Sequence, residues 1–533
     1  MTVFLVTAAC IMLVCVFLNR ITDRVGIPIL LAFILLGMLF GSDGIWKIAF
    51  SDFGFAEQVC SVALIFIMFY GGFGTNWTQA KPVAVEAALL STVGVALTAG
   101  ITGAFCYLAL GMGMMESFLL GSVISSTDAA SVFSILRSKK LGLKDNTASL
   151  LEMESGSNDP CSYMLTVVVL TVMAGSASPG QVAWMVFAQF AFGILVALVM
   201  SAFSLWMLRR FRFGAAGFDM VFVTAVALLS YGAAAMIGGN GYLSVYIVGI
   251  ILGNSKIKNK MTLVPFFDGV TGLMQMAVFF LLGLLSFPSR LPAVAGVALA
   301  AALFLTFVAR PLAVFLLMAP FRARMQQKIL VSFAGLRGAA SIVFAIMATV
   351  SDAYVKDDIF HIVFCIVLLS IAFQGTLIPW AAKRLDMIDE ELDVRRTFTD
   401  YVDEVPVQFM ELTIGPGHPW EGKKLSELGL VRELLIVLIL RSGDNLIPGG
   451  DTELLEGDRV VLSGPAYQDE HGVQLLEKTI GKGDLCAGKT LSEYSKDPQE
   501  LVVLIRRGED TVIPRGDTVL EIGDVLVIHS TLD

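Results

Sequence analysis

Residues 151–160 read Leu-Glu-Met-Glu-Ser-Gly-Ser-Asn-Asp-Pro, and they stand inside an apolar run that extends from about residue 148 to 174. A run of that length can cross the hydrocarbon core of a bilayer as a helix. An ionisable group at that depth costs several kcal/mol unless it is paired or hydrated, so Glu152, Glu154 and Asp159 are functional candidates. The stretch therefore predicts a helical membrane protein with a polar site inside one of its spans.

Helical spacing sorts the polar residues of this span into faces. Glu154 and Asn158 are four residues apart, as are Ser155 and Asp159, so each pair lies on neighbouring turns of a helix. Ser155, Asn158 and Asp159 can converge on one cavity, with Glu154 at its edge. Glu152 lies one turn nearer the cytoplasm and is explained equally well as a solvated charge at the mouth of the cavity.

Two other apolar runs are interrupted by polar residues. Residues 125–131 read Ser-Ser-Thr-Asp-Ala-Ala-Ser, and residues 335–341 read Gly-Leu-Arg-Gly-Ala-Ala-Ser. A cation site results if Thr127 and Asp128 face the residues of 151–160. The alternative is that small and hydroxyl residues only let helices pack and hydrogen-bond. That alternative would not need ionised groups such as Asp128 and Arg337.

Several of these side chains also have plainer individual explanations. The hydroxyl groups of Thr127 and Ser157 can bond to backbone carbonyls within a helix. Arg310 can extend to the inner membrane interface, and Tyr70 can be an ordinary packed aromatic residue. These alternatives stay open for single residues, whereas the cluster as a whole favours a cation site.

The composition agrees with a membrane protein. The 533-residue chain is 56% hydrophobic and 16% charged, with a mean hydropathy of +0.77, which is too apolar for a soluble globular protein. Neither CxxC nor HExxH occurs, so a disulfide framework, a structural zinc site and a zinc protease are not expected. We expect thirteen spans, near residues 3–19, 27–44, 58–74, 82–110, 116–136, 148–174, 181–208, 218–237, 241–254, 265–287, 291–319, 328–350 and 359–381.

The basic residues predict the orientation of these spans. Of the 23 Lys and Arg residues up to position 384, alternate connections hold 18 on one side and three on the other. The positive-inside rule assigns the richer side to the cytoplasm, so we expect the N-terminus outside and the C-terminal tail inside the cell. Arg20 and Arg24 follow the first apolar run, which is the reverse of a cleaved signal peptide and predicts a retained span.

The two interrupted runs are seven spans apart, so they run in opposite directions through the membrane. This is the pattern of inverted repeats whose broken helices cross at the midplane around an ion. Asp128 can compensate the positive N-terminal ends at such a crossing, and Arg337 the negative C-terminal ends.

The three polar motifs resemble the monovalent cation:proton antiporter-1 family, and within it the NhaP-type potassium/proton antiporters. The resemblance covers residues 1 to about 384. It implies that Asp159 is the carboxylate that binds the cation and the proton, with Asn158, Ser155, Thr127 and Asp128 as neighbours. It also implies that Glu154 and Arg337 form a structural ion pair. A homodimer, with a mobile core domain beside a dimerisation domain, is implied as well.

One position departs from the family pattern. Many members carry an acidic residue before Gly-Gly in the third span, where this chain has Tyr70 before Gly71-Gly72. The role assigned to that acidic residue is therefore in doubt here.

The tail contains an internal repeat. Shifted by 66 residues without a gap, residues 422–464 match 488–530 at 20 of 43 positions, which indicates a duplication. Each copy is expected to hold a short helix, an apolar strand (435–440 or 501–505), a Pro/Gly/Asp turn and a second strand (459–462 or 525–528). The copies, at 405–465 and 470–533, resemble the C-terminal lobe of RCK domains, also called TrkA-C. We expect a charged linker at 385–404.

The tail carries 14 Lys and Arg against 30 Asp and Glu residues, which argues against a nucleic-acid partner. No GxGxxG follows a strand there, so NAD sensing is not expected. The tail either binds a small anionic regulator, with Lys423 and Lys489 supplying positive charge, or only stabilises a dimer.

The resulting fold class is a polytopic α-helical membrane protein of about thirteen spans with inverted repeats, plus a cytosolic α+β tail. The expected function is electroneutral K+ (or Na+) efflux in exchange for H+ across the bacterial inner membrane, with no cofactor and no multivalent metal. A ligand-gated K+ channel is disfavoured because no TVGYG-type filter is present. A serine-dependent membrane enzyme is disfavoured because His361, near an outer end, is the one histidine inside a span.

Overall fold

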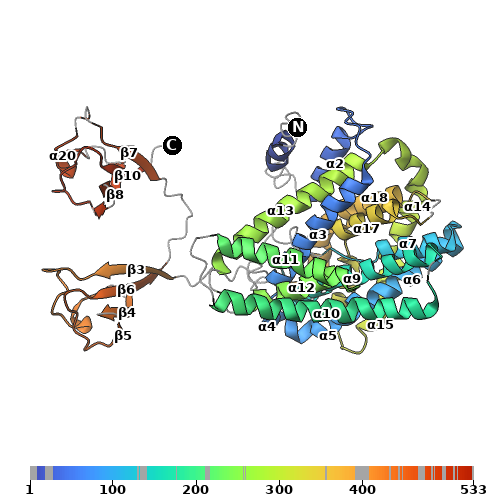
Figure 1. The fold of residues 1–533 in the computed structure, drawn as a ribbon, viewed down its shortest axis with the longest axis horizontal. Coiled ribbons are helices and arrows are strands. Elements are labelled where there is room, and N and C mark those ends of the chain that lie inside the picture. The colour runs from blue at the N-terminus through green and yellow to red at the C-terminus, as the bar shows by residue number, and fades with distance from the viewer. Residues whose placement is uncertain are drawn as a thin grey trace. The chain divides into compact units, whose positions relative to one another are not determined.

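The computed structural model divides the chain into two compact units, Met1–Val402 and Asp403–Asp533, which are described separately (Figure 1). It describes residues 9–530 except for short intervals. The residues outside the description are 1–8, 18–27, 129–130, 133–140, 176, 211–216, 256, 258–259, 354–356, 390–406, 431–433, 442–443, 447, 466–474, 482–483, 485, 495–499, 508–509, 513 and 531–533.

The first unit consists of helices. Within its described part, seven helical segments are long and apolar enough to cross a membrane: Phe53–Gly74, Trp77–Leu110, Pro179–Arg210, Phe218–Met236, Thr262–Leu285, Pro288–Leu317 and Ile359–Arg384. Four shorter helices are also apolar, and α9 (Thr147–Met173) is long enough but too polar for this set. Each of the thirteen expected spans coincides with helical residues, so helical membrane architecture is confirmed, while the number of spans stays a prediction.

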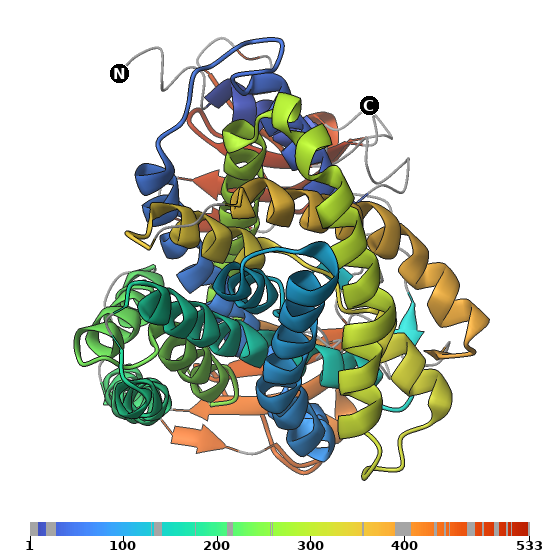
Figure 2. The ribbon, with the colours of Figure 1, turned by 90° about the vertical axis from the view of Figure 1, so that its right-hand side faces the viewer.

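The helices pack in two sets. The set that we call the panel consists of α2 (Ile29–Phe40), α3 (Phe53–Gly74), α10 (Pro179–Arg210), α11 (Phe218–Met236), α12 (Gly241–Gly253) and α13 (Lys260–Leu285). The set that we call the bundle consists of α5 (Ala84–Leu89), α6 (Val95–Leu110), α7 (Met114–Val123), α9, α14 (Leu291–Phe304), α15 (Arg310–Leu317), α16 (Met325–Phe333), α17 (Ala339–Val350), α18 (Ile359–Leu369) and α19 (Thr376–Arg384). In Figure 2, α10 and α11 of the panel lie on the opposite side of α6 from α14 and α15.

Glycines allow backbones to touch inside each set. A Cβ atom on Gly72 of α3 would lie 2.3 Å from the carbonyl oxygen of Tyr246 on α12, within the panel. A Cβ atom on Gly121 of α7 would lie 2.3 Å from the carbonyl oxygen of Ala99 on α6, within the bundle. Between the sets, Gly156 of α9 meets the ring of Tyr246 and not its backbone. Small residues that admit such close approach are typical of helix packing in membranes.

The two predicted interruptions are confirmed. The helix α7 ends at Val123, residues 125–128 are not helical, and Ser131 and Val132 are helical again. The helix α16 ends at Phe333, and α17 begins at Ala339 after the non-helical residues 335–338.

Three short π-helical segments widen helices of the bundle: Leu90–Gly94, Leu305–Ala309 and Ser370–Gly375. A π turn re-aims the side chains that follow it and is frequent at functional sites. The second segment directly precedes Arg310 of α15.

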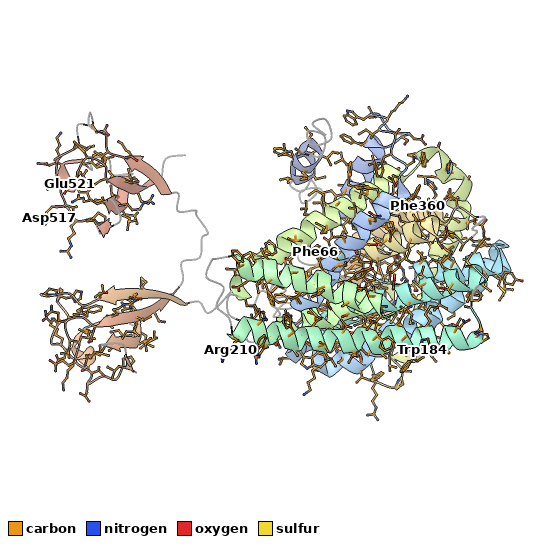
Figure 3. The ribbon with its side chains drawn as sticks, viewed as in Figure 1. Phe66, Trp184, Arg210, Phe360, Asp517 and Glu521 are labelled. Carbon is orange, nitrogen blue, oxygen red and sulfur yellow. The ribbon has the colours of Figure 1, made fainter. Side chains whose placement is uncertain are left out.

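The longest helix of the panel, α10, has an aromatic residue near one end and a basic residue at the other. Trp184, which is 60% exposed, and Arg210 lie towards opposite ends of α10 (Figure 3). Aromatic and basic residues at the two ends of an apolar helix are typical of the two membrane interfaces.

A short strand pair covers the start of the expected linker. The strand β1 (Gly142–Leu143), just before α9, pairs antiparallel with β2 (Ile388–Asp389), and Lys144 forms an ion pair with Asp386 at 3.1 Å. These first linker residues therefore belong to the membrane unit. The part of the linker from residue 390 lies outside the described residues.

The second unit contains two antiparallel four-stranded sheets of the same topology. The first has the order β3-β6-β4-β5 and the second β7-β10-β8-β9. The strands are β3 (Val407–Thr413), β4 (Leu435–Arg441), β5 (Asp444–Leu446), β6 (Arg459–Pro465), β7 (Leu475–Thr479), β8 (Glu500–Arg507), β9 (Asp510–Val512) and β10 (Val525–Ser530). A 3-10 turn at Leu425–Glu427 and α20 (Leu491–Tyr494) occupy the positions of the predicted short helices. The predicted repeat is thus confirmed in its strands.

An arginine–aspartate pair recurs at the shift of 66 residues. Arg441 donates two hydrogen bonds to the carboxylate of Asp458, at 2.7 and 2.6 Å. Arg507 does the same to Asp524, at 2.9 and 2.8 Å. Both aspartates are 1% exposed. Each arginine also donates to a backbone carbonyl, that of Glu453 or its counterpart in the second copy, so the pair joins strand and turn in both lobes.

Candidate functional site

The two helix interruptions touch each other. The backbone N–H of Asp128 donates to the carbonyl oxygen of Leu336 at 2.8 Å. A Cβ atom on Gly338 would lie 1.9 Å from a carboxylate oxygen of Asp128, so only glycine fits there. The crossing expected from the inverted repeats is thereby seen as a direct contact. The hydroxyl groups of Ser126 and Ser341, 215 residues apart in the chain, also lie within hydrogen-bond distance there.

Asp128 caps the helical segment that contains Ser131. Its carboxylate accepts hydrogen bonds from the backbone N–H of Ser131 at 3.1 Å and from the Ser131 hydroxyl at 2.5 Å. An aspartate that accepts from the residue three positions further along the chain has the hydrogen bonds of an N-cap, and its negative charge is favourable at a positive helix end.

The helix α9 holds the first interruption through Thr127. The hydroxyl of Ser155 donates to the backbone carbonyl of Thr127 at 2.5 Å. The amide nitrogen of Asn158 donates to the Thr127 hydroxyl at 2.6 Å. Asp159 is 8% exposed, and its carboxyl group interacts with the charge of Asp128 and with the Ser126 hydroxyl. The structure thus brings together all five residues that the sequence proposed for cation and proton binding.

A cavity of about 60 Å³ lies at this crossing. One water molecule needs roughly 10–15 Å³ on this measure, so the cavity has room for a partly hydrated monovalent cation. Its polar lining comes from Ser126, Thr127, Asp128, Glu152, Ser155, Asp159 and Gln275. Glu152, which the sequence left open as a solvated charge, is 6% exposed and part of this lining.

Asn158 contacts a residue of the cavity lining but does not line the cavity itself. It is fully buried and not part of the lining. Its amide nitrogen fixes the Thr127 side chain, and its amide oxygen has no hydrogen bond to a described residue. Its role here is to position Thr127.

The expected ion pair between Glu154 and Arg337 is wrong as a direct contact. Glu154 instead lies 2.5 Å from the Nη2 atom of Arg310, and both side chains are buried. The contact is one of charge and not an aligned hydrogen bond, because both Glu154 oxygens and the Arg310 Nε and Nη2 atoms lack hydrogen bonds to described residues. The interface position considered for Arg310 is therefore also wrong. The π turn at Leu305–Ala309 gives the physical reason, because it alters which face the following residue presents.

Arg337 holds the crossing by its own contacts. Its guanidinium donates to the carbonyl oxygen of Ser126 at 2.5 Å. Its backbone N–H donates to the hydroxyl of Ser370, in the third π turn, at 3.0 Å. Arg337 is 2% exposed and interacts electrostatically with both Arg310 and Glu154. The single negative charge of Glu154 therefore interacts favourably with two buried arginines.

The Asp159 carboxylate is buried at the helix crossing. Among the residues that the structure describes, no ion pair includes Asp159, whereas Glu154 pairs with Arg310 and Asp128 caps Ser131. A buried carboxylate of this kind can be neutralised by a proton or by a bound cation.

Sequence reasoning missed three features of the site. Arg310 is visible as a charge inside an apolar run, but the sequence does not identify it as the partner of Glu154. Gln275 carries no charge and stands outside the three motifs. Tyr246, whose ring lies against Gly156, has no signal in a single sequence. Tyr70, which stands where many members of the family carry an acidic residue, is 8% exposed and not part of the cavity lining.

Comparison with known protein families divides the chain in two. The family described as sodium/hydrogen exchanger, transmembrane, matches residues 8–384. The TrkA-C domain matches residues 409–467 and again residues 475–531, so each copy of the tail repeat corresponds to one such domain.

The chain is similar to characterised antiporters. It is 35% identical over 376 residues to the K(+)/H(+) antiporter NhaP of Alkalimonas amylolytica, which covers 70% of this chain and 65% of that protein, just under two thirds of its length. It is 32% identical over 467 residues to the K(+)/H(+) antiporter NhaP2 of Shewanella sp. (strain ANA-3), covering 86% and 81%. The Na(+)/H(+) antiporter NhaS2 of Synechocystis sp. is 24% identical over 352 residues, covering 62% of each chain.

The fold of the membrane unit also has a solved counterpart. The sodium proton antiporter MjNhaP1 from Methanocaldococcus jannaschii at pH 8 superimposes with a TM-score of 0.62 and 23% identity, covering 70% of this chain and 100% of that one. This likeness shows the fold shared by the two chains.

Proposed function

Because the chain belongs to the transmembrane sodium/hydrogen exchanger family, we propose that it exchanges a cytoplasmic monovalent cation, K+ before Na+, for external H+. Membership of this family makes it a membrane transporter and not an enzyme. The observation that carries the proposal is Asp159, a carboxylate in the cavity at the helix crossing that has no cationic partner among the described residues.

Exchange follows from competition at Asp159. The ionised carboxylate attracts a cation into the cavity, and the hydroxyl and backbone oxygens around it replace part of the hydration shell. When a proton binds to the same carboxylate, the attraction is lost and the cation leaves. Asp159 binds either the cation or the proton, but not both. Because each turnover carries the cation in one direction and the proton in the other, the two fluxes are coupled.

The neighbour of Asp159 supports electroneutral exchange. Position 158 is an asparagine, whose amide does not titrate and here positions Thr127. Asp128 is engaged as a helix cap. With one carboxyl group exchanging its ligand, one cation moves per proton.

The relatives support K+ as the first choice of cation. The NhaP and NhaP2 relatives described above, which both exceed 30% identity, are named K(+)/H(+) antiporters. Na+ is the second candidate, because NhaS2 is named a Na(+)/H(+) antiporter at 24% identity.

The position of the cavity supports alternating access. Its walls come from the bundle, through residues 126–128, 152–159 and 338–340, and from the panel, through α3 and α13. A site between two sets of helices opens to one side or the other when the sets shift against each other. In the proposed orientation the N-terminus is outside, the tail is cytoplasmic, the membrane is the bacterial inner membrane and the protein is a homodimer.

We assign the exchange reaction to residues 1–384 and regulation to the tail, with 385–404 as the connection and the lobes at 405–465 and 470–533. TrkA-C domains on the tail support a regulatory unit. A small anionic ligand remains the candidate regulator.

Reconstitution into proteoliposomes tests the proposal. With an imposed pH gradient, addition of K+ should dissipate the gradient, and Na+ and Li+ should do so less well. Asp159→Asn should abolish this flux while the protein still incorporates. Asp352→Asn, which removes an exposed carboxylate of a connecting loop, serves as the matched control. Cation-driven proton flux through Asp159→Asn at the wild-type rate would refute the assignment.

A further inference from the structure

The two walls of the cavity differ in polarity. The bundle contributes hydroxyl groups and carboxylates. The panel contributes Leu64, Ile67, Met68, Gly71 and Gln275. Gln275 of α13 is thus the one polar side chain that the described part of the panel places on the cavity.

Gln275 has no structural partner that explains an amide at this position. It is half-buried, between Met274 and Met276 on an apolar helix. It forms no hydrogen bond to any other residue within the description, unlike Gln189 of the same helix set, which bonds to Asn240. A partly buried amide without a protein partner costs free energy unless water or a ligand satisfies it.

The polar groups of the opposite wall are already engaged with one another. Ser155 donates to the backbone carbonyl of Thr127, Asn158 donates to the Thr127 hydroxyl, and Asp128 accepts twice from Ser131. The Asp159 carboxylate and the amide oxygen of Gln275 line the same cavity and can take a cation without breaking these bonds.

We propose that Gln275 is a specificity-determining residue, whose amide oxygen supplies the panel's ligand to the monovalent cation held at Asp159. This inference rests on the proposed exchange function and deepens it. A carboxylate supplies charge and attracts all monovalent cations, whereas a neutral oxygen at a defined place in the cavity discriminates between them by the distance at which it meets the ion. Ion preference is therefore set across the boundary between the two helix sets.

The location of Gln275 makes its contribution dependent on conformation. Asp159 belongs to the bundle and Gln275 to the panel, so the two groups share a cavity only in some relative positions of the sets. The cavity extends along α9 from Asp159 back to Glu152, towards the start of that helix, and along α3 to Gly71, towards its end. In the proposed orientation this is the cytoplasmic side, where the cation enters.

Cation titrations of proton flux in proteoliposomes test this role. Gln275→Met keeps the length of the side chain and removes the amide, and Gln275→Asn retains an amide on a shorter chain. Met276→Leu, one residue along the same helix and not part of the cavity lining, is the matched control. For each protein, the apparent KM and maximal rate are measured with K+, Na+ and Li+.

We expect Gln275→Met to raise the apparent KM for the preferred cation by about fivefold, the factor expected for one lost polar contact, and to change the ratio of KM values between K+ and Na+. Gln275→Asn should restore part of the preference, and Met276→Leu should match the wild type. Gln275→Leu repeats the test with a second apolar side chain if Gln275→Met does not incorporate.

Three outcomes would overturn the inference: an unchanged KM and ion order in the apolar variants, an equal rise in KM for all three cations, or the same change in Met276→Leu. These outcomes are distinguishable from failure of the proposed function. If the wild-type protein incorporates but no monovalent cation drives proton flux through it, the exchange function itself is wrong.

Discussion

Glu154 and Arg310 form a buried ion pair at 2.5 Å, joining α9 to the residue that follows a π turn between α14 and α15. Arg337 contacts the Ser126 carbonyl and not Glu154 directly. The negative charge of one glutamate thus stabilises two arginines, one by contact and one at longer range.

This pairing predicts non-additive effects of mutation. Glu154→Gln and Arg310→Gln should each lower stability by about 3–5 kcal/mol, because each leaves a buried charge without its partner. The double variant should lose less than the sum of the two. Thermal unfolding of the detergent-solubilised protein measures the cycle. A larger coupling of Glu154 to Arg337 than to Arg310 would contradict the geometry.

A methyl group at Gly338 should stop transport. A Cβ atom there would lie 1.9 Å from the Asp128 carboxylate, so Gly338→Ala must displace the helix cap and the crossing. We expect little or no exchange in proteoliposomes. Gly296→Ala on α14, where a Cβ atom has open space, should retain wild-type exchange. Normal activity of Gly338→Ala would show that Asp128 has freedom to move.

A second carboxylate beside Asp159 should alter the pH dependence of exchange. Asn158→Asp removes the amide that donates to the Thr127 hydroxyl and adds a titrating group next to the binding carboxylate. The pH profile of cation-driven proton flux should change, and the maximal rate should fall because Thr127 loses its support. A profile identical to that of the wild type would mean that position 158 does not influence the site.

The tail lobes should lose stability in acid. The Arg441 guanidinium, which donates two hydrogen bonds to the carboxylate, lowers the pKa of Asp458, and Arg507 lowers the pKa of Asp524 in the same way. A depressed pKa in the folded state contributes stability above the unfolded value of about 3.9, and this contribution disappears as the pH falls through the folded value. Hydrogen exchange of β4 and β8 in the full chain should accelerate below about pH 4.

Substitutions of the two arginines test whether the two lobes unfold independently. Arg441→Met should accelerate exchange in β4 while leaving β8 unchanged, and Arg507→Met should do the reverse. Lys424→Met, which removes an exposed partner of Asp451, should change neither strand, because exposed ion pairs contribute little. Equal effects of Arg441→Met on both strands would show that the lobes unfold together.

Removal of the tail should leave the exchange reaction in place. Truncation after about residue 400 keeps every residue of the cavity and removes both TrkA-C domains. We expect cation-driven proton flux with a shifted dependence on pH or ligand, because a regulatory unit can only bias an equilibrium that the membrane unit already has. A truncated protein that incorporates normally but does not transport would make the tail part of the transport machinery.

The contrast between Asp159 and Arg310 shows how far the sequence could predict the site. A carboxylate among polar residues in an apolar run is conspicuous because lipid excludes it, so Asp159, Asp128 and their neighbours could be found from local pattern. The partner of Glu154 could not be found in this way. A π turn at residues 305–309 shifts the face on which Arg310 lies, and the sequence of those residues does not predict the turn. Gln275 could not be predicted for another reason. A neutral amide on an apolar helix is not conspicuous in the sequence, and its place in the site depends on which residues of the other helix set it faces.

In the tail, the strands could be predicted from the sequence but the ion pairs could not. Its strands followed from the alternating apolar runs and from the repeat itself, since two copies at a fixed shift constrain each other. The Arg441–Asp458 pair joins the end of a strand to a turn seventeen residues further along the chain, and Arg507–Asp524 does the same in the second copy. Neither contact could be predicted, because the sequence does not show which charged side chains meet in the folded lobe.

The glycine contacts of the helix sets have a mechanical consequence. Within the panel and within the bundle, backbone meets backbone at Gly72 and Gly121, and sliding there would drive rigid main-chain atoms into one another. At Gly156, by contrast, α9 packs against the aromatic ring of Tyr246, and a side chain can change its rotamer when helices move whereas a main-chain contact cannot. Part of the boundary between the two sets therefore consists of side chains that can rearrange, whereas the hydrogen bond that Asn240 of the panel donates to the carbonyl oxygen of Pro160 on α9, at 2.7 Å, is one that a shift of the sets would have to break.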